Sequence, residues 1–438
     1  MKNIGEELKS GLRAKITCPY CWNQFAPENV LWVSEHNELL DDLRLGQDYQ
    51  QRFLPTRFTV KGEALDAKGF PCHQLACPHC HLVVPRSLLE MKPHFLSIFG
   101  APGSGKSYFL ASMTWELRKI LGTRFAISFS DADPTLNARL TNYEEHLFVN
   151  AHPDTLTPLR ELIDKTDWKE GISKNLYQSV QFGTQTVTYA LPFLFNMQPQ
   201  AGHPNYDQAD NLSRIVCLFD NAGEAFLPGQ DTTSAPVTRH MAHSRALMFV
   251  FDPTQDSRFR KLCTEDKGSA SAPFVARQEP ILQEAAARIR RYSGIRQTEK
   301  HNRPLIVVLT KCDAWSHLLE ENDPSEPWRE VNKANTPDGR SSMPFYALDM
   351  DLIERRSQAA RRLMLRVCPE IITAAEGFAE EVIYIPASAV GSQAEVDQAS
   401  GLLSIRPGET TPYWVTVPYL YALCRTTSGL IPSLPRKS

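Results

Sequence analysis

Residues 100–107 read GAPGSGKS and lie between the apolar run HFLSIF and the helix-like segment YFLASMTWELRKIL. This stretch matches G-x-x-x-x-G-K-[ST] in the context that the motif requires, after a strand and at the start of a helix. Glycines let the backbone curl so that successive N–H groups point at phosphate oxygens, and the helix N-terminus attracts negative charge. The motif therefore predicts a phosphate-binding loop, with an ordinary glycine-rich turn as the alternative.

Within this loop we expect Lys106 to reach the β- and γ-phosphates of a nucleotide and Ser107 to bind Mg²⁺. The other residues expected to contact the nucleotide here are Gly100, Gly103, Ser104, Gly105 and Tyr108. The loop by itself does not choose between ATP and GTP.

Short and nearly all-apolar runs recur along the rest of the chain and end in polar or glycine residues. Such runs are typical of parallel strands that helices cover on both faces. They lie at 94–99, 214–220, 246–252, 304–310 and 381–388. A further apolar segment, 186–197, is expected to pair antiparallel with 214–220. The pattern predicts an α/β fold built on a mostly parallel sheet.

Two segments of helical period lie between these runs, at 281–292 and 352–367, and each has one apolar face. Their arginines are expected on the opposite, outer faces. These are Arg288, Arg290, Arg291, Arg355, Arg356, Arg361 and Arg362. We interpret the arginine stripes as solvated surface, with a docking surface for a partner or nucleic acid as the alternative.

The 438 residues, 42% of them hydrophobic, suffice for two or three domains with at least one sizeable core. A change of composition near residue 92 divides the chain into an N-terminal module, 1–91, and a larger domain, 92–438. The net charge of −3 provides no global positive field to attract nucleic acid or acidic lipid. There is no apolar core of signal-peptide length and no stretch near the roughly 20 apolar residues of a membrane span, so we expect a cytoplasmic protein.

Polar motifs follow three of the later apolar runs. Asp220 ends RIVCLFD and is followed by Gly223, giving D-x-x-G. In that motif the aspartate can hold Mg²⁺ through water and the glycine N–H can meet the γ-phosphate. The sequence T-K-C-D, at 310–313, stands at the end of the buried run 304–310, and S-A, at 388–389, stands at the end of the last run.

In this order, each at a strand end, the four motifs resemble those of the Ras-like (TRAFAC-class) P-loop GTPases over about residues 94–425. The resemblance implies a Ras-like G domain that binds GTP or GDP, with Mg²⁺ held by Ser107 and Asp220. The stretches between Gly100 and Asp220 and between Lys311 and Ser388 exceed what a minimal domain of this type requires. We therefore expect helical insertions, at about 256–303 and 314–380.

The resemblance also implies how the base is read. Asp313 would accept hydrogen bonds from guanine N1–H and the 2-amino group, Lys311 would lie over the base, and the backbone N–H of Ala389 would meet O6. Thr310 and Ser388 would complete this side of the site. Adenine lacks the paired donors, so a buried Asp313 would favour GTP over ATP. A helix N-cap is the alternative role of Asp313.

The expected catalytic residues are Lys106, Gly223 and Glu224. Glu224 stands where many of these GTPases carry a water-orienting glutamine. A carboxylate accepts hydrogen bonds from water but cannot donate to the γ-phosphate, and its charge repels the phosphate, so we expect any hydrolysis to be slow. The first-switch threonine is not identifiable among Thr155, Thr157, Thr184 and Thr186, and we prefer helix-surface roles to a catalytic positive charge for Arg239, His240 and His243.

Two C-P-x-C units lie in the N-terminal module, at 18–21 and 77–80. Four thiolates in tetrahedral array form a closed structural Zn²⁺ site, so Cys18, Cys21, Cys77 and Cys80 are the expected ligands and the module resembles a zinc ribbon. The long segment between the units, 22–76, is expected to form an excursion with a strand at 57–62. Residues that could replace one of these ligands are Cys72, His73, His79 and His81.

An N-terminal zinc ribbon joined to such a domain resembles the bacterial double-GTPase families, which are associated with conflict and defence systems. This resemblance implies a GTP-binding, Mg²⁺-dependent switch with slow hydrolysis and a partner protein read through switch loops or the zinc ribbon. A scaffold that binds GTP without turnover and a P-loop ATPase or kinase are the alternatives. Nucleic acid is conceivable because Arg13, Lys15, Trp22 and Phe25 lie near the first cysteine pair, but the excursion is acidic.

Overall fold

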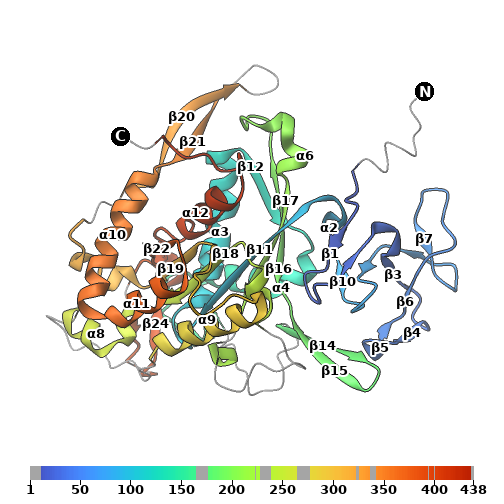
Figure 1. Cartoon of the computed structure of the whole chain (residues 1–438), viewed down its shortest axis with the longest axis horizontal. Helices are drawn as coiled ribbons and strands as arrows, with labels where there is room; N and C mark the ends of the chain where they lie inside the picture. Colours follow the sequence, from blue (N-terminus) through green and yellow to red (C-terminus); the bar gives the residue numbers. More distant parts are fainter. Residues whose placement is uncertain are drawn as a thin grey trace.

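The computed structural model describes residues 11–163, 176–221, 223–226, 238–263, 277–321, 325–335, 342–392, 394–398 and 400–435. Its centre is a seven-stranded sheet (Figure 1). In spatial order the strands are β12 (Ile127–Asp131), β16 (Phe193–Pro199), β17 (Arg214–Asp220), β11 (Lys92–Gly100), β18 (Ala246–Phe251), β19 (Leu305–Leu309) and β22 (Val382–Pro386). The five from β17 to β22 are parallel, and β16 pairs antiparallel with both β17 and β12.

This arrangement confirms the predicted α/β fold with a mostly parallel sheet. All five predicted parallel strands form, and their interior residues are buried because helices cover both faces of the sheet. The prediction for 186–197 is right only in its second half. Pro192 lacks an N–H donor and separates β16 from β15 (Gln185–Ala190), which pairs with β14 (Tyr177–Phe182) in a hairpin outside the sheet.

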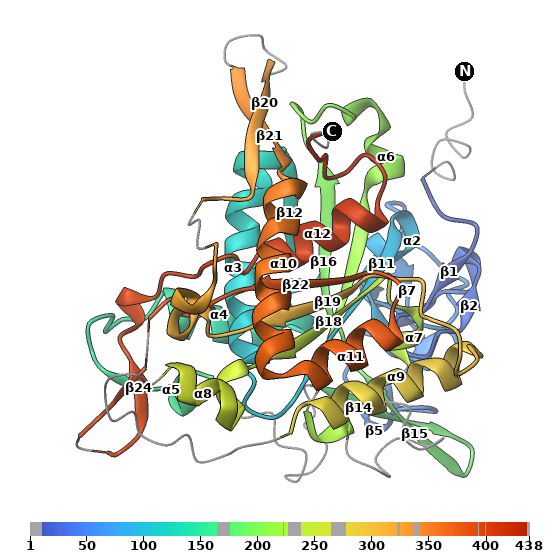
Figure 2. The ribbon, with the colours of Figure 1, turned by 60° about the vertical axis from the view of Figure 1, so that its left-hand side comes forward.

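Helices cover the two faces of the sheet through two apolar clusters. Helices α3 (Lys106–Phe125), α4 (Pro134–Phe148) and α12 (Val417–Thr426) belong to one cluster, and α9 (Glu279–Ser293) and α11 (Pro369–Phe378) to the other (Figure 2). Helix α10 (Met350–Val367) lies at the β22 edge and contributes to both clusters. Shorter helices are α2 (Ser87–Glu90), α5 (Leu159–Leu162), α6 (Ala209–Leu212), α7 (His240–His243) and α8 (Ser257–Cys263).

Two of the arginines predicted on outer faces are buried instead. Arg288 of α9 is 1% exposed, donates to Glu284 at 2.7 Å and lies over the ring of Phe226. Arg356 of α10 is also 1% exposed and lies over the ring of Trp414. Stacking on aromatic faces lets a guanidinium be covered at positions that helical periodicity assigns to solvent.

The expected insertion at 314–380 is not wholly helical. It contains the hairpin of β20 (Trp328–Asn335) and β21 (Ser342–Leu348), followed by α10 and α11. Elsewhere in the larger domain, β13 (Thr157–Pro158), β24 (Leu403–Ile405) and β23 (Glu395–Val396) form a small sheet.

The N-terminal module, drawn in blue in Figure 1, is built from short strands beside the central sheet. They are β1 (Ile16–Thr17), β2 (Gln24–Phe25), β3 (Leu31–Val33), β4 (Leu40–Asp42), β5 (Gly46–Gln50), β6 (Arg52–Phe53), β7 (Ala64–Leu65), β8 (Pro71–Cys72), β9 (Leu75–Ala76) and β10 (Val83–Val84). The predicted strand at 57–62 is wrong. The Thr59 hydroxyl accepts from the N–H groups of Lys61 and Glu63, and this competes with strand formation and makes a turn.

No helix within the described ranges is both long and apolar enough to cross a membrane.

Candidate functional site

The two C-P-x-C units form matching turns of the N-terminal module. One lies between β1 and β2 and the other between β9 and β10. The Sγ atoms of Cys18 and Cys80 are 3.7 Å apart, those of Cys21 and Cys77 are 3.8 Å apart, and the four Sγ atoms all lie within 4.8 Å of one another. Four Zn–S bonds of about 2.3 Å in a tetrahedron would place the sulfurs about 3.8 Å apart. The cluster therefore has the dimensions of a four-thiolate metal site.

The environment of the cluster also suits a cation. All four cysteines are buried, and burial raises the pKa of the Cys18 and Cys80 thiols well above the ordinary value. Hydrogen bonds from the neighbouring thiols lower the pKa of Cys77. Several buried thiolates repel one another unless a cation compensates them, so the residues fit Zn²⁺ as the group that would stabilise them.

The four possible replacement ligands lie outside this cluster in the described part of the chain. Cys72 donates to the Phe70 carbonyl, and His73 is exposed. His81 places Nδ1 2.9 Å from Asp42, and the ring of His79 packs against another aromatic ring. The geometry thus favours Cys18, Cys21, Cys77 and Cys80 as the four ligands of a metal ion.

The predicted phosphate loop lies where β11 ends and α3 begins. Gly103 and Gly105 adopt φ values of +70° and +88°, a region that side chains disfavour. A Cβ on Gly100 would collide with the Val250 carbonyl of β18. Three glycines are therefore required by conformation or by close packing.

Lys106 is the first residue of α3, and its side chain folds back over the loop. Its Nζ donates to the carbonyls of Gly100 and Ala101 at 2.9 and 2.8 Å. Ser107 is half-buried, and the buried hydroxyl of Ser104 has no hydrogen-bond partner in the described part of the chain. The Tyr108 hydroxyl donates to the Leu159 carbonyl at 2.5 Å, so its ring is directed to α5.

Asp220 ends β17 beside this loop. It is 5% exposed, its Oδ2 has no hydrogen-bond partner among the residues that the structure describes, and the guanidinium of Arg139 on α4 lies 3.7 Å away. Burial raises the pKa of Asp220, while the charges of Arg139 and Lys106 oppose that shift. A buried carboxylate oxygen without a hydrogen bond suits a cation or its water ligand. Sequence reasoning missed Arg139 because nothing in its helix distinguishes it from a surface arginine.

Gly223 brings the D-x-x-G segment against the phosphate loop. A Cβ at Gly223 would lie 2.6 Å from both Cδ and N of Pro102. Glu224 belongs to the 3-10 turn Gly223–Phe226, but its side chain lies outside what the structure describes.

The T-K-C-D and S-A segments meet at the ends of β19 and β22. Ser388 donates its hydroxyl to the Asp313 carboxylate, whose pKa is raised by burial and lowered in part by that bond. Thr310 donates to the Ser104 carbonyl of the phosphate loop at 2.9 Å. Lys311 adopts φ +55° and pairs with the buried Asp252 at 2.6 Å, a partner that the sequence did not indicate.

Ala389 completes this edge, because its carbonyl accepts from Ser112 of α3 at 2.8 Å. The four segments therefore converge at the carboxyl ends of adjacent parallel strands, the edge at which ligands bind in open α/β sheets.

The candidate first-switch threonines lie in two different places. Thr155 and Thr157 precede α5, next to the Leu159 carbonyl that accepts from Tyr108 at the start of α3. Thr184 and Thr186 lie in the β14–β15 hairpin, which contacts the N-terminal module through the Gln181 N–H and the Arg44 carbonyl.

Helix α7, downstream of D-x-x-G, was predicted to lie on the surface, but most of its residues are buried. The Asn221 Nδ2 and His240 Nε2 atoms are hydrogen-bonded at 2.8 Å. His240 Nδ1 lies 2.6 Å from the Ser97 hydroxyl, and the His240 ring stacks on Phe219. Arg239 is exposed, as expected. His243 is partly covered by Trp22 of the first cysteine turn, with ring centroids 4.3 Å apart and planes 9° apart. The first cysteine turn thus contacts the helix that follows the D-x-x-G segment.

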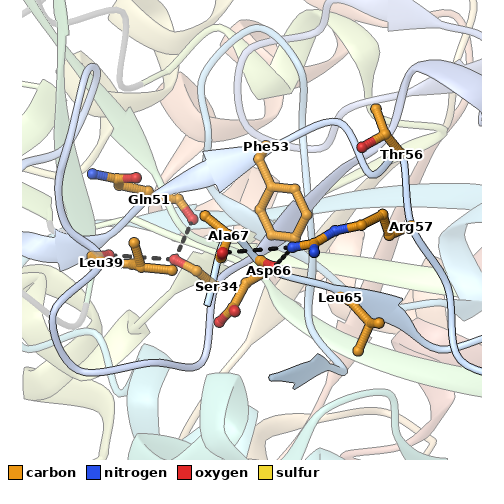
Figure 3. Close-up of a pocket in the computed structure, with 9 residues that line it drawn as sticks. All are labelled: Ser34, Leu39, Gln51, Phe53, Thr56, Arg57, Leu65, Asp66 and Ala67. Atoms are coloured by element: carbon orange, nitrogen blue, oxygen red, sulfur yellow. Dashed lines mark hydrogen bonds between the residues drawn. The ribbon is translucent and has the colours of Figure 1, made fainter. Parts of the chain in front are cut away.

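A small cavity of about 180 Å³ lies in the excursion of the N-terminal module rather than beside these motifs (Figure 3). Its polar groups bond to one another: Ser34 donates to backbone carbonyls and Arg57 donates to the Asp66 carbonyl. Ligand pockets are usually larger, about 300–1,000 Å³. The cavity is therefore not part of the candidate site.

Comparison with known proteins adds one distant likeness. No family model matches the chain. Over 199 residues it is 29% identical to a protein of Mycolicibacterium smegmatis provisionally named as the ESX-1 scaffolding and assembly protein SaeC. The aligned part covers 45% of this chain and 43% of that relative, so the chain matches less than half of the relative's length.

Proposed function

We propose that this chain binds GTP with Mg²⁺ at the carboxyl edge of its central sheet and acts as a nucleotide-dependent switch. The observation that carries the proposal is the convergence there of four motif segments that are far apart in the sequence. They are joined by the Thr310–Ser104 and Ser388–Asp313 hydrogen bonds and by the close approach of Gly223 to Pro102.

The phosphates would be held by the backbone N–H groups of the loop, the N-terminus of α3 and Lys106. Ser107 and Asp220 would hold Mg²⁺, which neutralises phosphate charge when bound. The unsatisfied Oδ2 of Asp220 supports this assignment. Lys106 and Arg139 place two positive charges near the same carboxylate, so charge balance around bound phosphates depends on both.

The base would be read by Asp313, oriented by the Ser388 hydroxyl, with Lys311 positioned by Asp252. Because guanine offers two donors and adenine does not, an Asp313 left without partners would disfavour ATP. Zn²⁺ in the N-terminal module would be structural, since four cysteines leave no open coordination position.

The same site allows a second class of function. The similarity to a protein named for scaffolding and assembly favours a nucleotide-stabilised scaffold as the second candidate. Single-turnover hydrolysis separates the two: slow conversion of bound GTP to GDP is expected for a switch, and GTP that stays intact supports the scaffold. The association with conflict and defence systems stays a prediction.

The test of nucleotide choice is Asp313→Asn, titrated with GTP, ATP and xanthosine triphosphate. The new amide N–H₂ would face the guanine 2-amino group, so GTP affinity should fall by about 2–4 kcal/mol. Xanthosine triphosphate offers a carbonyl there and should become the better ligand. Equal ATP and GTP affinity in the wild type, or unchanged GTP affinity in the variant, would show that 310–313 does not read the base.

A further inference from the structure

Five cations gather at the opposite edge of the sheet, where the parallel strands begin. We call Arg13, Lys92, Arg214, Arg245 and Arg303 the basic edge. Lys92 and Arg214 face each other as the first residues of β11 and β17, and the N–H of Arg245 donates to the Phe95 carbonyl of β11. Figure 2 shows α2 beside the start of β11, on this side of the sheet.

Three of the four guanidinium groups of the basic edge, those of Arg13, Arg214 and Arg303, are fixed by backbone carbonyls. Arg303 donates to Ala242 and Ser244 at 2.7 and 2.6 Å. Arg214 donates to the carbonyls of the segment just before β17 at 2.6 and 2.9 Å. Arg13 donates to the carbonyl of the residue before Lys92 at 3.3 Å. Such bonds hold the charged groups in place but leave their charge uncompensated.

Among the described residues, no carboxylate lies within ion-pair distance of these five cations. The arginines on the outer face of α10 are different. Arg355, Arg361 and Arg362 pair with Glu321, Glu376 and Glu320, respectively. These three arginines of α10 are therefore neutralised by glutamates of the chain, whereas the five cations of the basic edge have no such partner among the described residues.

The arginines of the basic edge lie close enough for their charges to act on one another. Burial lowers the pKa values of Arg13, Arg214 and Arg303, and the charges of Arg13 and Arg245 lower that of Arg214 further. Beneath them, burial and the charges of Arg214 and Arg245 lower the pKa of His94 to about 3, so it adds no charge near neutral pH. Half-buried cations without counter-charges are unfavourable, and an anionic partner would relieve that cost.

We propose that the basic edge binds an acidic segment of a partner protein. Fixed guanidinium forks match carboxylates in bidentate pairs, which favours glutamate- or aspartate-rich chain over a diffuse polyanion. Nucleic-acid binding uses a longer track of about 6–10 phosphate contacts, and the net charge of this chain is −3. The segment would contact the N-terminal module through Arg13 and the larger domain through Lys92, Arg214, Arg245 and Arg303. This proposal does not depend on nucleotide binding.

The test uses fluorescence anisotropy of the full chain with a labelled Glu-Gly repeat peptide. The wild type should bind it more tightly than a Ser-Gly repeat, with an affinity that falls as salt rises. The double variant K92E/R245E reverses two exposed charges whose side chains make no hydrogen bond in the described structure, and it should lower affinity about tenfold or more. The control R355E/R366E makes the same charge change on α10 and should bind as the wild type does.

Three results would overturn the proposal. One is a wild type that does not distinguish the Glu-Gly from the Ser-Gly peptide, and another is equal loss of affinity in the two double variants. The third is single-stranded DNA of the same charge binding more tightly than the peptide, with that binding lost in K92E/R245E. That third result would assign the basic edge to nucleic acid instead.

Discussion

The contact between the D-x-x-G segment and the phosphate loop makes Gly223→Ala the sharpest test of the site geometry. The added Cβ would lie 2.6 Å from Cδ and N of Pro102 and 2.9 Å from the Ala101 carbonyl carbon. An ordinary carbon contact is about 3.5–4.0 Å, so one of the two segments must move by roughly 1 Å. Two of the three contacted atoms belong to the backbone and the third to a rigid proline ring, so no flexible side chain can absorb the shift.

We expect this overpacking to cost about 1–3 kcal/mol of stability. The loss of GTP-binding free energy should exceed the loss of stability, because the phosphates are held by backbone groups and the affinity depends on their exact placement. Gly122→Ala is the matched control. Gly122 lies within α3 with nothing within 4 Å of its Cβ position, so alanine there should stabilise the helix by up to about 1 kcal/mol.

Thermal unfolding and GTP titration of the two variants decide the matter. Unchanged GTP affinity in Gly223→Ala, or the same response in both variants, would refute the packing of D-x-x-G against the phosphate loop. A fall in stability without any GTP binding in the wild type would instead preserve the packing and reject the nucleotide.

Three further outcomes are expected. Replacing Cys77 and Cys80 together by serine should reduce the bound zinc, measured by elemental analysis, from about one equivalent to none; zinc that survives would reject the cluster as its site. Trp22→Ala should destabilise the chain by about 3 kcal/mol in denaturant unfolding, and Trp22→Phe by less, because the ring bridges the first cysteine turn and α7; an unchanged midpoint would contradict that role. Burial depresses the His94 pKa from 6.5 to about 3, so only the unfolded chain takes up this proton as pH falls below about 6.5, and stability should fall by up to about 1.4 kcal/mol per pH unit. In His94→Gln that part of the acid sensitivity should disappear, and an identical pH profile would disprove it.

The sequence predicted the sheet well because each parallel strand is a short apolar run buried on both faces. Local composition suffices for such strands, and the motif residues follow at their ends by chain connectivity alone. The grouping of the four cysteines was equally predictable, since two C-P-x-C turns in one chain are typical of a four-thiolate metal site. These features depend on neighbours in sequence.

The misses depend on tertiary contacts. The strand predicted at 186–197 divides at Pro192, and the new hairpin pairs within itself and packs against both the N-terminal module and one face of the sheet. Arg288 and Arg356 were placed outside by periodicity, but stacking on aromatic rings buries them. Arg139 reaches Asp220 from a helix that joins the site only in three dimensions. No pattern of spacing carries that information.

Helix α7 is the element at which the separate parts of the molecule meet. His240 contacts Asn221 in the D-x-x-G segment, and His243 stacks on Trp22 of the first cysteine turn. The carbonyl of Ala242, between them, accepts from Arg303 of the basic edge at 2.7 Å. A single helical turn cannot shift at one end and stay fixed at the other, since its own hydrogen bonds join the two. A displacement of the D-x-x-G segment that moved His240 would therefore also move the contacts of this helix with Trp22 and with Arg303.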